Sequence, residues 1–207
     1  MRFKHNYVYF CYSKSSGNSK TRFLAMGDCK NCGKMLSLSE EGAAFKMVEV
    51  HGHDTEKQIF FYEHEFYVFS NFSAFMIHWK GKLYPTSEHA YHAEKFGDEN
   101  LKAQIRSALS AHDALKLAHE HKDKYRTDWD NIKLNVMKEI LRAKASQHPY
   151  AMKKLLESGD RELIEDSWRD PYWGWGPNKD GENHLGKLWM ELRDELKNSA
   201  NKEAVLS

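Results

Sequence analysis

The chain has 207 residues, of which 41% are apolar and 29% are charged. This balance is typical of a soluble globular protein and excludes a disordered one. There are 31 lysine and arginine residues against 30 aspartate and glutamate residues, so the net charge is only +1. A protein that coats nucleic acid nonspecifically is therefore disfavoured, because it would need a large positive charge. The length favours one globular domain with an appendage over two full domains.

The sequence carries no signal that points to a membrane or to secretion. No stretch approaches the roughly 18 consecutive apolar residues of a membrane-spanning helix, and the N-terminus lacks a small-residue cleavage site. The three cysteines are an odd number, which argues against a framework of paired disulfides. We therefore expect a cytoplasmic protein with no membrane partner.

Residues 1–57 are predicted to form a small β-rich extension. Short β-leaning runs at 6–12, 21–26 and 43–50 are separated by Ser, Gly and Lys residues. The pair Cys29-x-x-Cys32 has the form of a zinc knuckle, although a full site needs four ligands. The candidate ligands for such a structural zinc ion are Cys11, Cys29 and Cys32 with one of His5, His51 and His53. The alternative is that these thiols stay reduced and pack as small apolar groups.

The chain changes character after residue 57. An aromatic-rich extended stretch is expected over 58–73, and a helix then begins after Pro85, with Thr86 or Ser87 as its N-cap, and ends at Gly97. Further helices are predicted over 100–109, 111–121, 128–145 and 149–157, with helical structure resuming at 163–165. After a loop over 170–178, a last helix covers 184–196, and 198–207 is expected to be a flexible tail.

The predicted helix after Pro85 carries the most informative polar residues. Glu88, Tyr91, His92 and Lys95 are spaced i, i+3, i+4 and i+7, so they share one helix face. A carboxylate and an amine on one face could serve catalysis. They could equally form a solvated face of weak ion pairs, a common pattern on helices.

The loop over 170–178 interleaves two tryptophans with two glycines. Large flat side chains outside regular structure suit stacking against a base or another flat ring, although an aromatic loop that fills the core fits the spacing equally well. Asn183 follows just before the last predicted helix, where it could cap that helix or read the edge of a ligand.

These segments, in order, resemble the motif series of the YbiA-like (NADAR) superfamily over roughly 59–197. The motifs are Phe69-Ser70-Asn71-Phe72, Tyr84-Pro85-Thr86-Ser87-Glu88-His89-Ala90-Tyr91 with Lys95-Phe96, Trp129 with Lys133 and Met137, Gly159-Asp160 with Glu165, Asp170 with Trp173-Gly174 and Gly176, and Gly181-x-Asn183-x-Leu185-Gly186 with Leu192-Arg193. His92 departs from the pattern, since a Gln is common at that position. The resemblance predicts a catalytic domain over 58–197 and leaves residues 1–57 unexplained.

The resemblance implies a compact, mainly helical α+β fold and hydrolysis of an N-glycosidic bond, with no metal or other cofactor needed for the step. Position by position, Glu88 and Lys95 match the family's helix-borne pair, and Asp170 completes the expected catalytic set. Glu88 would orient the ribose or activate water, and Asp170 would stabilise the positive charge that develops on the sugar. Lys95 would act as a cationic donor or as a Schiff-base nucleophile. The residues expected to bind substrate are Asn71, Glu165, Trp173, Gly174 and Asn183.

Three interpretations of the function stay open at this point. The first is a glycosidase for a phosphorylated N-riboside, such as the ribosylamino-pyrimidine phosphates of riboflavin biosynthesis, with release of ribose 5-phosphate. The second is a glycohydrolase that removes ADP-ribose from guanine in nucleic acid. The third is a non-catalytic module that binds ADP-ribose or a nucleotide, which the charged groups expected on both sides of the sugar argue against.

Overall fold

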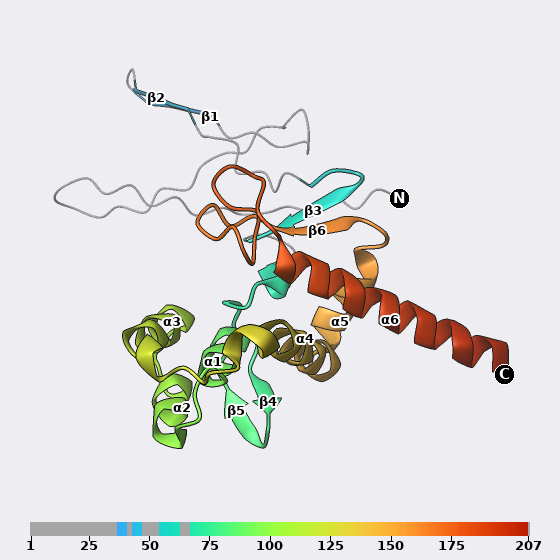
Figure 1. Cartoon of the computed structure of the whole chain (residues 1–207). Coiled ribbons are helices and arrows are strands. Elements are labelled where there is room, and N and C mark those ends of the chain that lie inside the picture. Colours follow the sequence, from blue (N-terminus) through green and yellow to red (C-terminus); the bar gives the residue numbers. More distant parts are fainter. Residues whose placement is uncertain (1–36, 41–42, 47–53, 63–66, 207) are drawn as a thin grey trace. The chain divides into compact units, whose positions relative to one another are not determined.

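The structure is a computed structural model that describes residues 37–40, 43–46, 54–62 and 67–206. It divides the chain into two compact units, 1–51 and 52–207. In the first unit, β1 (Ser37–Glu40) and β2 (Ala43–Lys46) form an antiparallel pair (Figure 1). β2 lies within the β-run predicted over 43–50. The three cysteines and their candidate histidine partners lie outside the described residues, so the zinc knuckle stays a prediction.

A parallel strand pair supports the larger unit. β3 (Gln58–Phe61) and β6 (Glu162–Glu165) run side by side, with Phe61 opposite Glu165. The helical structure expected at 163–165 is therefore wrong. Leu163 and Ile164 are both buried, and a short continuous apolar run of this kind fits a strand covered on both faces. The strand's partner lies about a hundred residues earlier in the chain, so no local pattern reveals it.

The helices confirm most of the sequence prediction. They are α1 (Ser87–Ala93), α2 (Glu99–Arg106), α3 (Ala111–Glu120), α4 (Trp129–Gln147), α5 (Pro149–Glu157) and α6 (His184–Leu206). Thr86 is the N-cap of α1, and its hydroxyl accepts a hydrogen bond from the His89 amide. α6 continues past its predicted end at Leu196, while the flexibility expected of 198–207 stays a prediction.

A hairpin that the sequence pattern did not reveal precedes α1. β4 (Ile77–Trp79) and β5 (Lys82–Tyr84) are antiparallel, and the two turn residues between them both have positive φ, as in tight two-residue hairpins. Glu94 ties this hairpin to the end of α1, because its two carboxylate oxygens each lie 2.7 Å from a donor, Trp79 Nε1 and Lys80 Nζ. Two 3-10 turns, η1 (Tyr67–Phe69) and η2 (Lys122–Lys124), complete the described elements.

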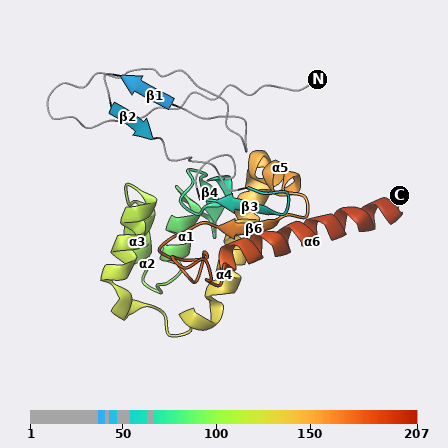
Figure 2. The ribbon, with the colours of Figure 1, turned by 90° about the horizontal axis from the view of Figure 1, so that it is seen from above.

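The core of the larger unit forms around α4, which contacts α1, α5, α6 and β4 (Figures 1 and 2). α6 packs along β6, and its fully buried Trp189 donates a hydrogen bond from Nε1 to the Phe69 carbonyl at 2.9 Å. The result is an α+β fold dominated by helices, which confirms the predicted fold class. Within the described part of the chain, no helix is both long enough and apolar enough to span a bilayer.

Candidate active site

Two segments far apart in sequence bring their acidic side chains together. Glu88 lies on α1, Glu165 ends β6, and Asp170 lies in the loop that follows. Burial raises the pKa of Glu165, and the charges of Asp170 and Glu88 raise it further. Trp173 from the same loop meets Tyr91 of α1 edge to face, with 5.4 Å between ring centroids. The structure therefore places the predicted residues of α1 opposite those of the 165–173 segment, and the candidate active site lies between them.

Glu88 is buried and held from two sides. Its backbone amide donates to the Asn71 carbonyl at 3.1 Å, and its Oε1 lies 2.7 Å from Nε2 of His92, one turn further along α1. Burial lowers the pKa of His92, against the opposing effect of the Glu88 carboxylate that its Nε2 meets. His92 Nδ1 is buried and has no partner among the described residues. His92 thus orients Glu88, a role that the prediction did not assign, because the i, i+4 spacing fits a surface ion pair equally well.

Lys95 lies in a box of aromatic rings just after α1. Its Nζ is 5.1 Å from the ring centroids of both Tyr91 and Tyr125 and 5.9 Å from that of Trp129. Burial lowers the Lys95 pKa to about 8, against the opposing effect of the negative charge on Glu88. Lys95 can therefore lose its proton close to neutral pH. From the sequence, Trp129 was named only among the family motifs and Tyr125 was missed; the fold brings both rings to Lys95.

Glu165 is the most strongly perturbed carboxyl group of the site. Burial, the charge of Asp170 and the charge of Glu88, in that order, raise its pKa from the ordinary 4.5 to about 8. Its Oε2 is buried without a hydrogen-bond partner among the described residues. With this pKa, Glu165 carries a proton at neutral pH. No described side chain accepts a hydrogen bond from its buried Oε2.

The loop after β6 is ordered by Asp170 and by a close glycine contact. One oxygen of Asp170, Oδ1, accepts hydrogen bonds from the backbone amides of Tyr172 and Trp173, each at 2.9 Å. A Cβ atom on Gly174 would lie only 2.6 Å from the Glu165 carbonyl oxygen, so no side chain fits there. This close approach explains why residue 174 is a glycine. The substrate contacts predicted for Trp173 and Gly174 stay predictions.

The two predicted asparagines lie in different settings. Asn71 is buried, its Nδ2 meets the sulfur of Met137 at 3.2 Å, and its Oδ1 has no partner within the described structure. Asn183 instead accepts from the Glu165 amide at 3.0 Å and donates to the Leu163 carbonyl at 2.9 Å. Its side chain therefore holds the end of β6 rather than capping α6. Asn71 has an acceptor to offer a ligand, while the expected ligand contact of Asn183 stays a prediction.

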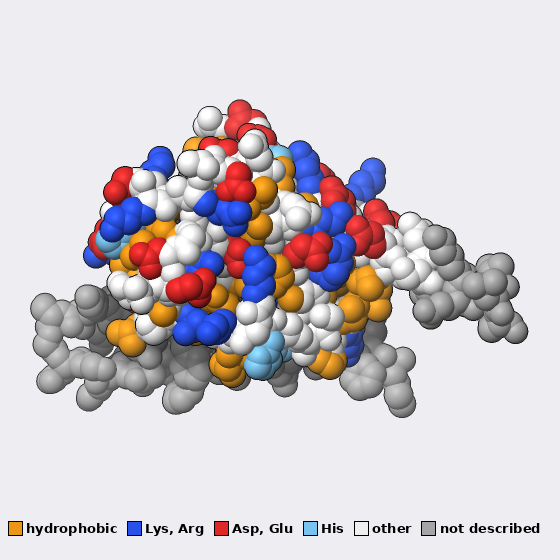
Figure 3. Space-filling model, turned by 60° about the horizontal axis from the view of Figure 1, so that its bottom comes forward, with side chains coloured by type: hydrophobic (Ala, Val, Ile, Leu, Met, Phe, Trp, Pro, Cys, Tyr) orange, Lys and Arg blue, Asp and Glu red, His pale blue; other side chains and the backbone are white. Residues whose placement is uncertain are grey.

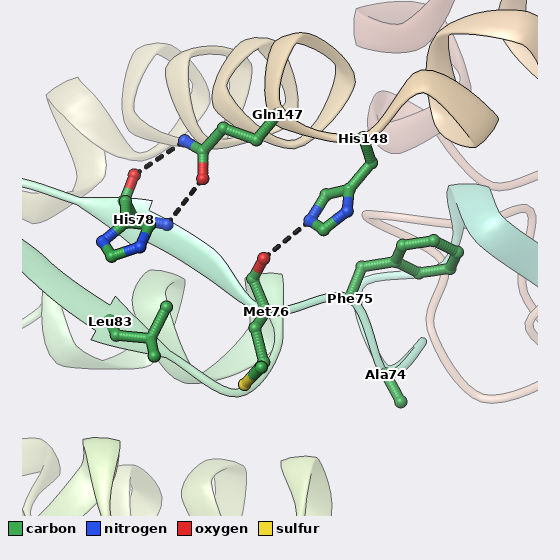
Figure 4. Close-up of a pocket in the computed structure, with 7 residues that line it drawn as sticks. All are labelled: Ala74, Phe75, Met76, His78, Leu83, Gln147 and His148. Carbon is green, nitrogen blue, oxygen red and sulfur yellow. Dashed lines mark hydrogen bonds between the residues drawn. The ribbon is translucent and has the colours of Figure 1, made fainter.

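A separate hollow lies on the surface near the β4–β5 hairpin (Figure 4). Gln147 pairs with the backbone of His78 there through both ends of its amide, and His148 Nε2 lies 2.6 Å from the Met76 carbonyl oxygen. None of the predicted site residues lines this hollow, so it is distinct from the candidate active site. Over the described residues, no group of three or more His, Cys, Asp or Glu side chains is placed to hold a metal ion.

Comparison with known proteins connects this geometry to a family. The family model of the NADAR domain matches residues 60–197. The N-glycosidase YbiA of Escherichia coli is 41% identical over 128 residues, which cover 62% of this chain and 80% of that protein. A riboflavin biosynthesis protein of Vibrio vulnificus is 37% identical over 156 residues, or 73% of this chain, but this stretch is only 42% of that longer protein.

A solved structure shows the same architecture. The NMR structure of the E. coli protein YbiA superimposes with a TM-score of 0.65 at 36% sequence identity. The match covers 72% of this chain and 90% of the other. This identity and coverage show that the two proteins are homologous. They share the arrangement of helices and strands around the candidate site.

Proposed function

The chain belongs to the NADAR family, and from this premise we propose that it hydrolyses the N-glycosidic bond of a phosphorylated N-riboside and releases ribose 5-phosphate. The protein is a hydrolase of N-glycosyl bonds, in line with the N-glycosidases among its relatives. The finer assignment, to substrates such as the ribosylamino-pyrimidine phosphates, draws support from the Vibrio relative's name.

The observation that carries the proposal is the buried Glu165 carboxyl group, whose Oε2 has no partner among the described residues and whose pKa burial raises to about 8. Breaking a C–N glycosidic bond leaves negative charge on the departing nitrogen and positive charge on the sugar. A group that keeps its proton at neutral pH inside a buried site can transfer it to that nitrogen, and Glu165 has the raised pKa that this role needs. The proton from Glu165 then completes the N–H of the released base.

Glu88 and Asp170 supply the opposite charge. Glu88 comes from α1 and Asp170 from the same segment as Glu165, and their carboxylates can stabilise the positive charge that develops on the anomeric carbon. Glu88, oriented by His92, accepts a proton from the water that adds to that carbon. The water's oxygen forms the new C–O bond as the C–N bond breaks, and its second proton stays on the sugar hydroxyl.

Lys95 has two roles open to it in this scheme. As an ammonium it donates toward the ring oxygen or the phosphate of the substrate. As a free amine it attacks C1 of the ring-opened sugar, the C–N bond to the base breaks as the base leaves with a proton, and the Schiff base that forms is hydrolysed by water. A pKa lowered to about 8 is compatible with either role. Borohydride separates them, because it fixes a sugar to Lys95 only if the imine forms, and mass spectrometry of the digested protein locates the adduct.

Substrate contacts are assigned to Asn71 and Trp173. The unpartnered Asn71 Oδ1 accepts a hydrogen bond from a ribose hydroxyl or from the base, and Trp173 offers a half-buried ring to stack on the base. On the face shown in Figure 3, basic and acidic side chains intermingle. The net charge of +1 gives no support to the alternative of a nucleic-acid substrate, which would favour a strongly basic protein.

The deciding experiment compares two substrates. Purified protein receives a ribosylamino-pyrimidine phosphate or, in parallel, DNA that carries ADP-ribose on guanine, and mass spectrometry detects the released sugar. We expect ribose 5-phosphate from the first substrate, with a loss of rate of about a hundredfold for Glu88→Gln and for Asp170→Asn. Release of ADP-ribose alone would favour the alternative activity. Ligand binding without either product would mean a non-catalytic module.

Three further expectations belong with this proposal. The catalytic domain covers 58–197, with the β-rich segment before it and the tail after it. The reaction proceeds without a metal or other cofactor, so turnover is unchanged after dialysis against a chelator. We expect the protein to act in the cytoplasm.

A further inference from the structure

Lys144 is a buried lysine that the proposed reaction does not use. It lies near the end of α4, its side chain is fully buried, and its Nζ donates to the Ser70 carbonyl at 2.9 Å and to Ser73 Oγ at 2.7 Å. The amine also lies 5.2 Å from the ring centroid of Phe75. Within the described structure, no carboxylate forms an ion pair with it.

Such a lysine is unfavourable for stability alone. Burial without a compensating charge penalises the ammonium form, and Lys144 has its pKa lowered to about 7 by burial alone. An apolar side chain of similar length fills the same space without that penalty. Buried ionisable groups of this kind are better explained by what they hold in place than by what they add to folding.

What Lys144 holds is the turn that carries Asn71. Ser70 and Ser73 flank Asn71, and Ser73 Oγ also donates to the Ser70 carbonyl at 2.7 Å. The Asn71 carbonyl in turn accepts the backbone amide of Glu88, at the first turn of α1. A continuous chain of hydrogen bonds and peptide units therefore connects Lys144 to Asn71 and to Glu88.

Asn71 has little else to fix its side chain. Among the described residues, its Nδ2 has only the weak acceptor Met137 Sδ as a hydrogen-bond partner, and its buried Oδ1 has none. The position of this amide depends on the backbone of the 70–73 turn. We propose that Lys144 is a positioning residue, which clamps this turn so that Asn71 and Glu88 meet the transition state in the right geometry. This inference rests on the glycosidase activity proposed above.

The test uses Lys144→Met, which keeps the length and apolar stem but removes the amine. Lys138→Met is the matched control, since Lys138 lies on the same helix but forms surface ion pairs with Glu191 and Glu195. We expect kcat of Lys144→Met to fall at least tenfold with KM within threefold, while its melting temperature stays equal to or above that of the wild type. Lys138→Met should retain kcat within twofold.

A second variant guards against misfolding. Ser73→Ala removes one acceptor of Lys144, and we expect it to lower kcat several-fold and to add little to the loss in Lys144→Met, because both changes loosen the same clamp. If Lys144→Met does not fold, kcat of Ser73→Ala tests the proposal by itself: a several-fold fall supports it, and a wild-type kcat overturns it. Folded Lys144→Met with wild-type kcat, or loss of kcat only in proportion to lost folded protein, would overturn the proposal. Absence of glycosidase activity in the wild type would instead refute the proposed function.

Discussion

Glu88 on α1 and Glu165 at the end of β6 are both buried carboxyl groups of one site, yet their surroundings differ. Glu88 faces a hydrogen-bond donor, Nε2 of His92 at 2.7 Å. Glu165 faces two other acidic groups and has an oxygen without a partner within the described structure. A donor favours the charged form of a carboxyl group, whereas burial beside like charges favours the neutral form. The contrast teaches that one site can hold a charged carboxylate and a protonated carboxyl group near each other.

The difference between the two glutamates follows from the elements that carry them. α1 is a local structure, so Glu88 and its donor His92 come from successive turns of one helix. β6 is fixed by pairing with β3 and by the Asn183 amide, which bonds the backbone on either side of Ile164. Neither contact involves the Glu165 carboxyl group, whose Oε2 has no hydrogen-bond partner among the described residues.

The largest expected effect comes from removing the proton that Glu165 holds. Glu165→Gln keeps the shape of the side chain but has no acidic proton, so kcat should fall about a thousandfold, within the range measured for general acids. In the wild type, kcat should also decline as pH rises through about 8, because Glu165 then ionises. Steady-state rates from about pH 6 to pH 10 check both points. The control is Glu162→Gln on the same strand, whose side chain is exposed; a wild-type rate for Glu165→Gln would contradict the comparison.

The same variant predicts a change in stability with pH. The folded protein holds the Glu165 proton with a pKa of about 8 against an ordinary 4.5, so its stabilising effect is complete below pH 4.5 and is lost as pH rises through about 8. Glu165→Gln has no carboxyl group that can ionise, so its stability does not fall with pH for this reason. Relative to the wild type, it should gain on the order of 5 kcal/mol between about pH 4.5 and pH 9. Urea unfolding across this range measures the gain, and a constant difference would show that Glu165 is not held neutral.

A smaller effect is expected where the loop packs on β6. An added methyl group on Gly174 would collide with the Glu165 carbonyl oxygen, so Gly174→Ala should cost about 1–3 kcal/mol of stability. Gly97→Ala is the matched control, since its Cβ meets nothing within 4 Å. Chemical denaturation of both variants makes the test. Equal stability of the two would mean that the loop does not press on the strand as described.

The smallest effect concerns the donor to Glu88. His92→Phe removes the hydrogen bond at Glu88 Oε1, and we expect kcat to fall about tenfold, less than the loss of an acid or base itself would cost. His92→Gln retains an N–H donor and should recover most of this rate. The comparison of kcat for the two variants isolates the hydrogen bond from the loss of the ring. Equal rates would show that His92 serves packing alone.

The part of the site carried by α1 could be predicted from sequence because helix spacing and capping are local. Pro85, the Thr86 cap and the i, i+7 spacing of Glu88 and Lys95 are enough to predict a charged helix face from the residues alone. The resemblance to a family then indicated which residues on that face matter. What these signals could not show is that His92 donates to Glu88, since a histidine at i+4 fits a surface ion pair equally well.

The other part of the site depends on contacts between distant segments. β6 reads as a continuation of a helical pattern, because its alignment with β3 leaves no trace in the residues 162–165 themselves. The raised pKa of Glu165 arises from burial and from Asp170 and Glu88, which only the fold brings near it. The setting of Lys144 was equally hidden, since a lysine within an amphipathic helix is usually a surface residue.

The central claim, that Glu165 is neutral at physiological pH while it faces two carboxylates, is tested most directly by titrating its carboxyl group. Infrared difference spectra of the wild type against Glu165→Gln isolate the C=O stretch of that one protonated group. We predict that this band persists at pH 7 and disappears with an apparent pKa of about 8, and at a lower pH in Asp170→Asn. A band already lost near pH 4.5 would contradict the account.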